Sequence, residues 1–220
     1  MTLTYVDIHT HHKYSQRKDV ESIINSDYFL SGKTPEQNHT VGLHPWWIEK
    51  VDVTWKTQLT QLLSKPYCLG LGEIGLDYFI EFDRKIQAEV CLTQLEMAKK
   101  FKILRIVFHC VRAYSDLYKL IKESGYSGKC LLHDFNGNEH ELKQFLKLDC
   151  YFGFGAKLFK MESKTRNLIN LVPLERMFLE TDEQDNITIE QIYHEASQLR
   201  KIEPNVFATS LLENYQIFTR

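Results

Sequence analysis

The sequence alternates short apolar runs, rich in β-branched and aromatic residues, with stretches that have the spacing of amphipathic helices. The expected strands lie, in chain order, in YVDIHTH, VESII, TVGLH, CLGLGEIGL, ILRIVFHC, CLLHDF, CYFGFGA and MFLET. The clearest expected helices cover residues 88–98, 113–121, 189–199 and 207–218. Strands buried on both faces and followed by helices are typical of parallel sheets, so the pattern predicts an α/β fold, most simply a (β/α)8 barrel of the TIM type.

An open, doubly wound sheet is the alternative arrangement of the same elements. That fold often binds nucleotides through G-x-G-x-x-G or G-x-x-x-x-G-K-[ST], and neither motif follows any of the expected strands. No low-complexity linker, Gly/Ser tract or block of like charges divides the chain. We therefore expect one domain over residues 1–220, built as a barrel.

Ionisable residues recur where the expected strands end. In a parallel barrel the carboxyl ends of the strands converge on the face where catalysis takes place. Six such residues are His9, His11, Glu73, His109, His133 and Asp182. A single His or Asp at a strand end is often only a satisfied polar group. Six buried together would be costly without a cation, so the pattern favours one or two divalent metal ions in an open, catalytic site.

The kinds of donor narrow the choice of metal. Imidazole nitrogens and carboxylates without a thiolate suit Zn²⁺, Mn²⁺, Fe²⁺ or Co²⁺ better than Ca²⁺. The five cysteines lie about 20 residues apart, without a C-x-x-C pair. We expect them to be reduced core residues and not structural zinc ligands.

Net charge and hydropathy exclude several classes of partner. The formal net charge is −2, without a long run of one sign, so any recognition of phosphate must be local. The N-terminus lacks the pattern of a signal peptide, and no apolar run approaches the roughly 18 residues of a membrane span. We expect a cytoplasmic protein with no membrane partner and no obligate protein partner.

Several motifs, in this order, resemble the TatD family of metal-dependent hydrolases within the amidohydrolase-like superfamily. They are DIHTHH, GLHPWW, LGEIGLDY, VFHC, LLHDFNG and FLETD, followed by a C-terminal LLENYQIF. The resemblance implies a barrel in which the six residues named above hold two divalent ions, Zn²⁺, Mn²⁺ or Mg²⁺, with Glu73 as a bridge. It also implies that His44 faces the substrate or supports the metal site.

The sequence departs from the family pattern at three places. The helix between the first two strands is missing, which predicts a truncated or distorted barrel. The Pro- and Arg-containing loop that usually follows ETD is replaced by EQDNITIEQ, which leaves the substrate open. Arg112 is shifted by one position relative to the family's common Arg, so that role is not transferred to it.

The predicted reaction is hydrolysis of a phosphodiester by a metal-activated water, with Glu73 and Asp182 as the catalytic carboxylates. The resemblance implies a deoxyribonuclease that shortens single-stranded DNA from its 3′ end. Lys13, Tyr78 and His44 are the expected substrate contacts. Further cations on loops are either phosphate contacts or solvated side chains: Arg17, Lys18, Lys157 and Lys160. Four aromatic residues beyond strand ends either stack on bases or pack at the rim: Trp46, Trp47, Tyr78 and Phe79.

Two other functions stay open at the level of sequence. A barrel's chemistry follows its loops, so the same scaffold is compatible with hydrolysis of a non-nucleic ester, a lactone, an amide or an aminoacyl-tRNA bond. A non-catalytic protein with structural metals is the third interpretation.

Overall fold

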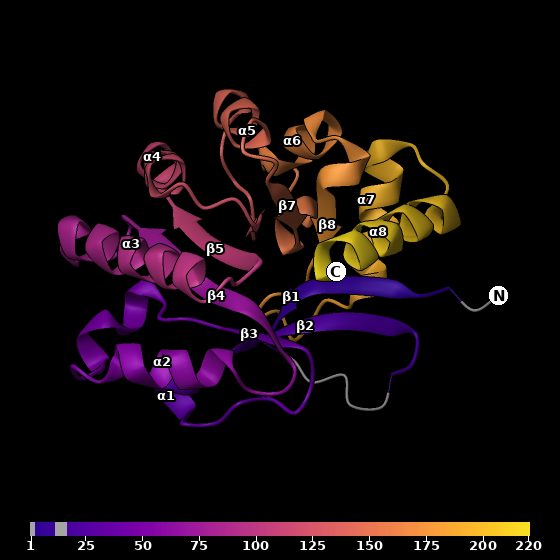
Figure 1. Cartoon of the computed structure of the whole chain (residues 1–220). Coiled ribbons are helices and arrows are strands. Elements are labelled where there is room, and N and C mark those ends of the chain that lie inside the picture. The colour runs from indigo at the N-terminus through magenta and orange to yellow at the C-terminus, as the bar shows by residue number, and fades with distance from the viewer. Residues whose placement is uncertain (1–2, 12–16) are drawn as a thin grey trace. The chain divides into compact units, whose positions relative to one another are not determined.

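The computed structural model describes residues 3–11 and 17–220, and its eight strands form one sheet in chain order (Figure 1). The strands are β1 (Tyr5–Thr10), β2 (Val20–Ser26), β3 (His39–Val41), β4 (Cys68–Asp77), β5 (Arg105–Val111), β6 (Lys129–Leu132), β7 (Tyr151–Phe154) and β8 (Met177–Leu179). The pairings β1–β2, β3–β4, β4–β5, β5–β6 and β7–β8 are parallel. The predicted (β/α)8 fold is confirmed, and all eight expected strands are present.

Helices alternate with most of the strands. They are α1 (Tyr28–Ser31), α2 (Trp55–Leu63), α3 (Arg84–Lys100), α4 (Tyr114–Ser124), α5 (Glu139–Leu146), α6 (Thr165–Leu171), α7 (Ile189–Arg200) and α8 (Pro204–Thr219). Three short 3₁₀ helices are η1 (Pro45–Lys50), η2 (Ala156–Phe159) and η3 (Leu174–Arg176). Among the described residues, no helix lies between β1 and β2. None of the described helices is long and apolar enough to cross a membrane.

The chain divides into two compact units, which we call the terminal unit (residues 1–24 and 133–220) and the middle unit (residues 25–132). In the terminal unit, α8 packs on β1 and β8. Helix side chains bind the ends of these strands. The Tyr193 hydroxyl accepts a hydrogen bond from the Val6 amide at 3.0 Å and donates to its carbonyl at 3.2 Å. The Asn214 amide donates to the carbonyls of Leu174 and Met177 at 2.8 and 3.0 Å.

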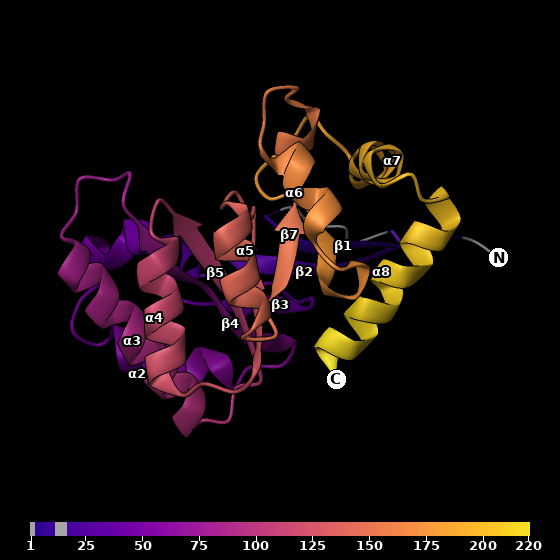
Figure 2. The same cartoon turned by 90° about the horizontal axis from the view of Figure 1, so that it is seen from above.

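In the middle unit, α3 and α4 pack side by side beside the strands (Figures 1 and 2). Two fully buried glutamines, one seven residues after the other on α3, bind the main chain of strand ends. Gln94 bonds both the amide and the carbonyl of Leu43, at 2.8 and 3.1 Å. Gln87 does the same for Asp77, at 2.7 and 2.8 Å. The ends of β3 and β4 are thereby fixed by a helix rather than left as free loops.

The place of Glu73 in its strand differs from the prediction. The strand expected in CLGLGEIGL is β4, but Glu73 was expected at a strand end and instead lies inside β4, four residues before its last residue, Asp77. Gly75 allows this continuation, because its φ is +142° and a Cβ atom there would lie 2.0 Å from the His109 carbonyl oxygen. The motif GEIGLD is thus one strand pressed closely against β5, and its carboxyl end is Asp77.

The cysteines are as predicted. All five are free, four of them are buried, and Cys68 is half-buried. Burial raises the pKa of the Cys68 thiol to about 11 and that of Cys91 to about 12, so both are protonated at neutral pH and unreactive.

Candidate metal centre

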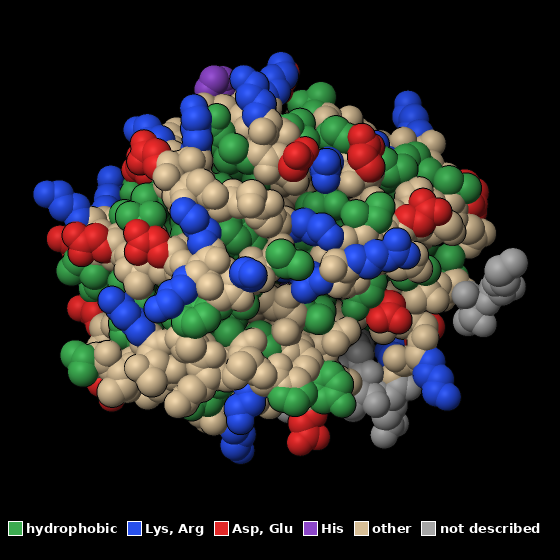
Figure 3. Space-filling view, viewed as in Figure 1, with side chains coloured by type: hydrophobic (Ala, Val, Ile, Leu, Met, Phe, Trp, Pro, Cys, Tyr) green, Lys and Arg blue, Asp and Glu red, His purple; other side chains and the backbone are tan. Residues whose placement is uncertain are grey.

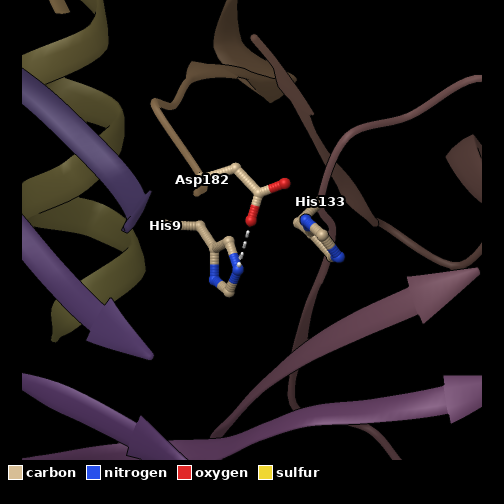
Figure 4. Close-up of side chains that lie close together, drawn as sticks. All are labelled: His9, His133 and Asp182. Atoms are coloured by element: carbon tan, nitrogen blue, oxygen red, sulfur yellow. Dashed lines mark ion pairs between the residues drawn. The ribbon is translucent and has the colours of Figure 1, made fainter. Parts of the chain in front are cut away.

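In the terminal unit, three of the predicted ligands converge: His9 on β1, His133 directly after β6, and Asp182 after β8 (Figure 4). One ligand atom from each lies within 4.8 Å of the other two. His9 Nε2 is 3.6 Å from Asp182 Oδ1, the contact dashed in Figure 4. The two histidines are buried, whereas the Asp182 side chain is 30% exposed. The cluster is therefore open to solvent at its carboxylate.

His11 approaches the same carboxylate. Its Nε2 lies 3.7 Å from Asp182 Oδ1, and its ring stands edge-on to that of His9, with centroids 5.6 Å apart. Both histidines of the H-x-H motif therefore face one aspartate. Two imidazole nitrogens and a carboxylate are ligands that Zn²⁺ and Mn²⁺ bind. The lone pairs of neutral imidazoles repel a carboxylate that they face, whereas a divalent ion would attract all three groups.

The main chain places Asp182 beside the histidines. Its amide donates to the His9 carbonyl at 3.1 Å, and its carbonyl accepts from the His11 amide at 3.1 Å. Asp182 itself has a left-handed backbone, with φ at 54°, which is costly for a residue with a Cβ atom. The two hydrogen bonds to β1 stabilise this conformation.

A buried carboxylate below the cluster strengthens the junction of β1 and β8. Asp7 is fully buried and accepts two hydrogen bonds from Thr181, from the amide at 2.9 Å and from the hydroxyl at 2.7 Å. The Thr181 hydroxyl also lies 2.8 Å from that of Thr10. Asp7 on β1 therefore fixes the residue immediately before Asp182.

Glu180 is a second buried carboxylate near the cluster. Its Oε1 lies 3.5 Å from His133 Nδ1 and accepts a hydrogen bond from the Asp134 amide. Gly153 on β7 makes room for it, since a Cβ atom there would lie 2.1 Å from Glu180 Oε2. Burial raises the pKa of Glu180, and the neighbouring His133 opposes this rise. A carboxylate near Nδ1 leaves Nε2 as the nitrogen of His133 that is available to a metal.

In the middle unit, His44, Glu73 and His109 form a second cluster with ligand atoms within 4.8 Å of one another. Glu73 Oε1 lies 3.1 Å from His109 Nδ1 and 3.6 Å from His44 Nε2. All three residues are buried. The Asn25 side chain holds the glutamate, because it donates to Glu73 Oε2 at 3.1 Å and accepts from the Glu73 amide at 3.0 Å.

The hydrogen bonds of His44 indicate its tautomer. Its Nδ1 accepts from the Trp46 amide at 3.1 Å as the cap of η1. An accepting Nδ1 carries no hydrogen, so the neutral ring has its hydrogen on Nε2, the nitrogen that faces Glu73. This tautomer suits a hydrogen-bond donor better than a metal ligand, in line with the expected role of His44 beside the metal site.

Asp77, at the end of β4, is a site residue that the sequence reasoning missed. Its Oδ2 lies 3.1 Å from His109 Nε2 and accepts from the Trp46 indole at 2.7 Å, while Oδ1 accepts from the Phe79 amide at 2.8 Å. Burial acts to raise the pKa of Asp77, but these hydrogen bonds outweigh it and hold the pKa at about 2. A carboxylate on Nε2 leaves Nδ1 of His109, on the Glu73 side, as the nitrogen available to a metal.

The other predicted contacts have mixed outcomes. Lys13 lies outside the described residues. The Tyr78 hydroxyl donates to Asp116 Oδ2 at 2.8 Å, which raises the pKa of Tyr78, already raised by burial, to about 12. Arg17 pairs with Asp19 and Glu190, and Lys157 pairs with Asp134. These two cations are engaged within the terminal unit and were not recognisable as such from the sequence.

Four supporting residues were absent from the predicted site: Asp7, Asn25, Asp77 and Glu180. Three of them stand inside the motifs DIHTHH, GEIGLDY and FLETD, so the signal was present as a polar residue within an apolar run. Asn25 carried no such signal, because VESIINS resembles any strand that ends in polar residues.

Both clusters fit divalent metals of the predicted kind. Each offers imidazole nitrogen and one carboxylate, and neither contains a cysteine. Three such ligands in the terminal cluster, and His109 and Glu73 in the middle one, leave coordination positions for water or substrate, as in catalytic and not structural sites.

Comparison with known proteins points the same way. A profile of the family described as TatD related DNase matches residues 25–218. The uncharacterized metal-dependent hydrolase YjjV of Escherichia coli (strain K12) is 32% identical over 151 residues, 66% of this chain and 57% of YjjV. The 3′-5′ ssDNA/RNA exonuclease TatD of Edwardsiella piscicida is 30% identical over 148 residues, 65% of this chain and 56% of the exonuclease. The chain thus spans little more than half the length of the curated relatives it matches.

The fold has solved counterparts. The crystal structure of YJJV, a TatD homologue from Escherichia coli K12, superposes with a TM-score of 0.86 at 23% identity and covers 100% of this chain and 99% of that chain. The likeness extends over the whole chain, so the described residues between β1 and β2, which contain no helix, are compatible with the fold of that protein.

Proposed function

Because the chain belongs to the TatD related DNase family, we propose that it is a divalent-metal-dependent phosphodiesterase that shortens single-stranded DNA from the 3′ end. The observation that carries the proposal is the presence of two clusters, each with buried histidines and one carboxylate. The family relatives named metal-dependent hydrolase and ssDNA/RNA exonuclease support the reaction and the substrate. On this proposal the clusters hold two ions, Zn²⁺, Mn²⁺ or Mg²⁺.

The residues have distinct roles in the proposed reaction. The metals, when bound, lower the pKa of a water molecule towards 7 and offset charge on the phosphoryl oxygens. Asp182, the half-exposed carboxylate of the terminal cluster, accepts the proton of that water and returns it to the leaving oxygen. Glu73 would be a metal ligand in the middle cluster, and His44, whose Nε2 lies 3.6 Å from Glu73 Oε1, would offer that nitrogen as a hydrogen-bond donor.

Surface charge is compatible with local recognition of phosphate. Lys and Arg side chains lie interspersed with Asp and Glu on the face shown in Figure 3. A net charge of −2 gives no general attraction to nucleic acid. Affinity for the substrate therefore comes from the metals and from contacts close to them.

The second candidate is a hydrolase of a non-nucleic ester, lactone, amide or aminoacyl-tRNA bond. It is favoured by the short connection after Asp182, where only residues 183–188 precede α7 and no arginine occurs. The same carboxylates and metals would activate water in that reaction. The two functions therefore differ only in substrate.

The test is hydrolysis of end-labelled single-stranded DNA by metal-stripped protein to which Mg²⁺, Mn²⁺ or Zn²⁺ is returned. We expect stepwise shortening from the 3′ end, its loss in Glu73→Ala, and full activity in the control Glu89→Ala, which changes an exposed glutamate on α3. Metal-loaded protein that leaves DNA and RNA intact but cleaves a carboxylic ester or lactone would replace this proposal by the second one.

A further inference from the structure

Two exposed aromatic residues are bound to Asp77, the carboxylate that contacts His109 of the middle cluster. Of the four aromatic residues that the sequence offered, Trp47 is buried and Tyr78 is half-buried with its hydroxyl on Asp116. Trp46 is 49% exposed and Phe79 is 68% exposed. Trp47 and Tyr78 therefore pack against the protein, whereas Trp46 and Phe79 present ring surface to solvent.

Asp77 holds both exposed aromatics in place. One of its carboxylate oxygens accepts from the Trp46 indole at 2.7 Å, and the other accepts from the Phe79 amide at 2.8 Å. The same carboxylate lies 3.1 Å from His109 Nε2. The Trp46 indole and the Phe79 main chain are therefore both bound to the carboxylate that contacts His109, and the Trp46 ring centroid is 5.9 Å from that of His109.

A cation accompanies the more exposed ring. The Arg112 guanidinium lies over Phe79, 4.8 Å from the ring centroid. Arg112 is exposed and follows β5 directly, with a left-handed backbone at φ 55° that turns the chain at this point. Arg84 lies similarly over Tyr78, at 4.5 Å. Arginines and exposed aromatic rings together are the surface on which unpaired nucleobases stack.

We infer that Trp46, Phe79 and Arg112 form a platform that stacks unpaired nucleobases of the substrate strand and feeds its end to the middle cluster. The inference rests on the proposed function for the reaction, but it adds a recognition element: bases, and not only phosphates, are bound. It also predicts a preference for single strands, because the faces of bases in a duplex are already stacked on one another.

The experiment measures binding and cleavage of two fluorescent single-stranded oligonucleotides with the same phosphates, one intact and one with abasic nucleotides at its last three 3′ positions. Dissociation constants are measured by anisotropy in the metal-loaded Asp182→Asn protein, and kcat/KM in the protein with Asp182 intact. Phe79→Ala is expected to weaken binding of the intact strand about 10-fold and to leave binding of the abasic strand unchanged. Phe79→Trp is expected to retain both affinities.

Phe101→Ala is the matched control. Phe101 is also exposed, at 39%, and also carries a cation over its ring, Lys100 at 5.5 Å, but it follows the last residue of α3 and its amide binds the Met97 carbonyl instead of Asp77. It is expected to change neither affinity. Arg112→Ala is a second variant, and we expect it to weaken binding of the intact strand more than binding of the abasic one.

The outcomes separate the platform from the proposed function. If Phe79→Ala weakens binding of the intact and the abasic strand equally, or weakens neither, the platform is overturned even if DNA is cleaved. A selective loss on the intact strand, with no cleavage by metal-loaded wild type, would support the platform and overturn the nuclease. Wild-type protein that binds the two oligonucleotides equally would also overturn the platform.

Discussion

The terminal and middle clusters contain similar donors but are held in different ways. In the terminal unit the main chain does most of the positioning, since Asp182 is bonded through its amide and carbonyl to the strand that carries His9 and His11. In the middle unit side chains do it, since Glu73 is held by Asn25 and His109 lies between two carboxylates.

Because of this difference, we expect the supporting residues of the terminal unit to contribute mainly to folding stability and those of the middle unit mainly to metal affinity. A ligand held by strand pairing depends on the junction of β1 and β8, so disturbing its support affects folding of the whole unit. A ligand held by side-chain hydrogen bonds depends on a few polar atoms, so disturbing these changes ring orientation and metal affinity while the strands persist. Variants of the supporting residues should reveal the contrast.

The largest effect is expected for Asp182→Asn. The amide retains the shape of the side chain and the backbone bonds to β1 but cannot accept a proton from water. We expect kcat to fall about 1000-fold with an unchanged melting temperature. Activity within a few-fold of wild type would remove Asp182 from its proposed role.

The next effect is a loss of stability in the terminal unit. Asp7→Ala leaves the amide and hydroxyl of Thr181 buried without their acceptor, which should lower the free energy of unfolding by about 3 kcal/mol. Denaturation by urea measures it. Asp7→Asn is the control, since it keeps one acceptor oxygen and should cost about 1 kcal/mol. Equal stability of wild type and Asp7→Ala would refute the role assigned to this junction.

For the middle unit we expect the opposite result. Asp77→Asn keeps the volume of the side chain but removes the charge that orients His109 and binds the Trp46 indole. Metal affinity, measured by isothermal titration with Mn²⁺, should fall about 10- to 100-fold. If stability falls as much as in Asp7→Ala while metal affinity is unchanged, the contrast between the two clusters is wrong.

The smallest effect concerns pH and an ion pair away from both clusters. Hydrogen bonds with Arg17 lower the pKa of Asp19, and for Glu190 they outweigh burial, which acts to raise its pKa. A carboxyl whose pKa is lower in the folded than in the unfolded state stabilises the folded state at pH values above its unfolded pKa. This stabilisation disappears as the pH falls through its folded pKa. Arg17→Met should therefore lower the melting temperature by about 3 °C or less at pH 7. Melting curves from pH 7 to 3 should converge below about pH 4; a constant difference would contradict this origin.

Much of the fold could be predicted because its signals are local. Alternating apolar runs such as ILRIVFHC specify a strand within a few residues, and the stripe of α3 specifies a helix. The position of Glu73 inside β4, and not at its end, was less predictable. The continuation of β4 beyond Glu73 depends on the close approach of Gly75 to β5, which is a contact between residues 34 positions apart.

The candidate ligands were found for the same reason, as ionisable residues in or just after recognisable strands. Their supports could not be assigned, because a polar residue in a strand gives no sign of its partner. Asp7 reaches Thr181, 174 positions away in the chain, and Asn25 reaches Glu73, 48 positions away. Likewise, nothing in the sequence separated exposed Phe79 from its half-buried neighbour Tyr78.

If both clusters bind a divalent ion, the metal content of the protein should show it. Wild type, His109→Ala and His133→Ala are equilibrated with Mn²⁺ or Zn²⁺, and bound metal is counted by mass spectrometry. Two ions are expected in wild type and fewer in each variant, with the folded state retained. Undiminished metal binding in both variants would contradict this expectation.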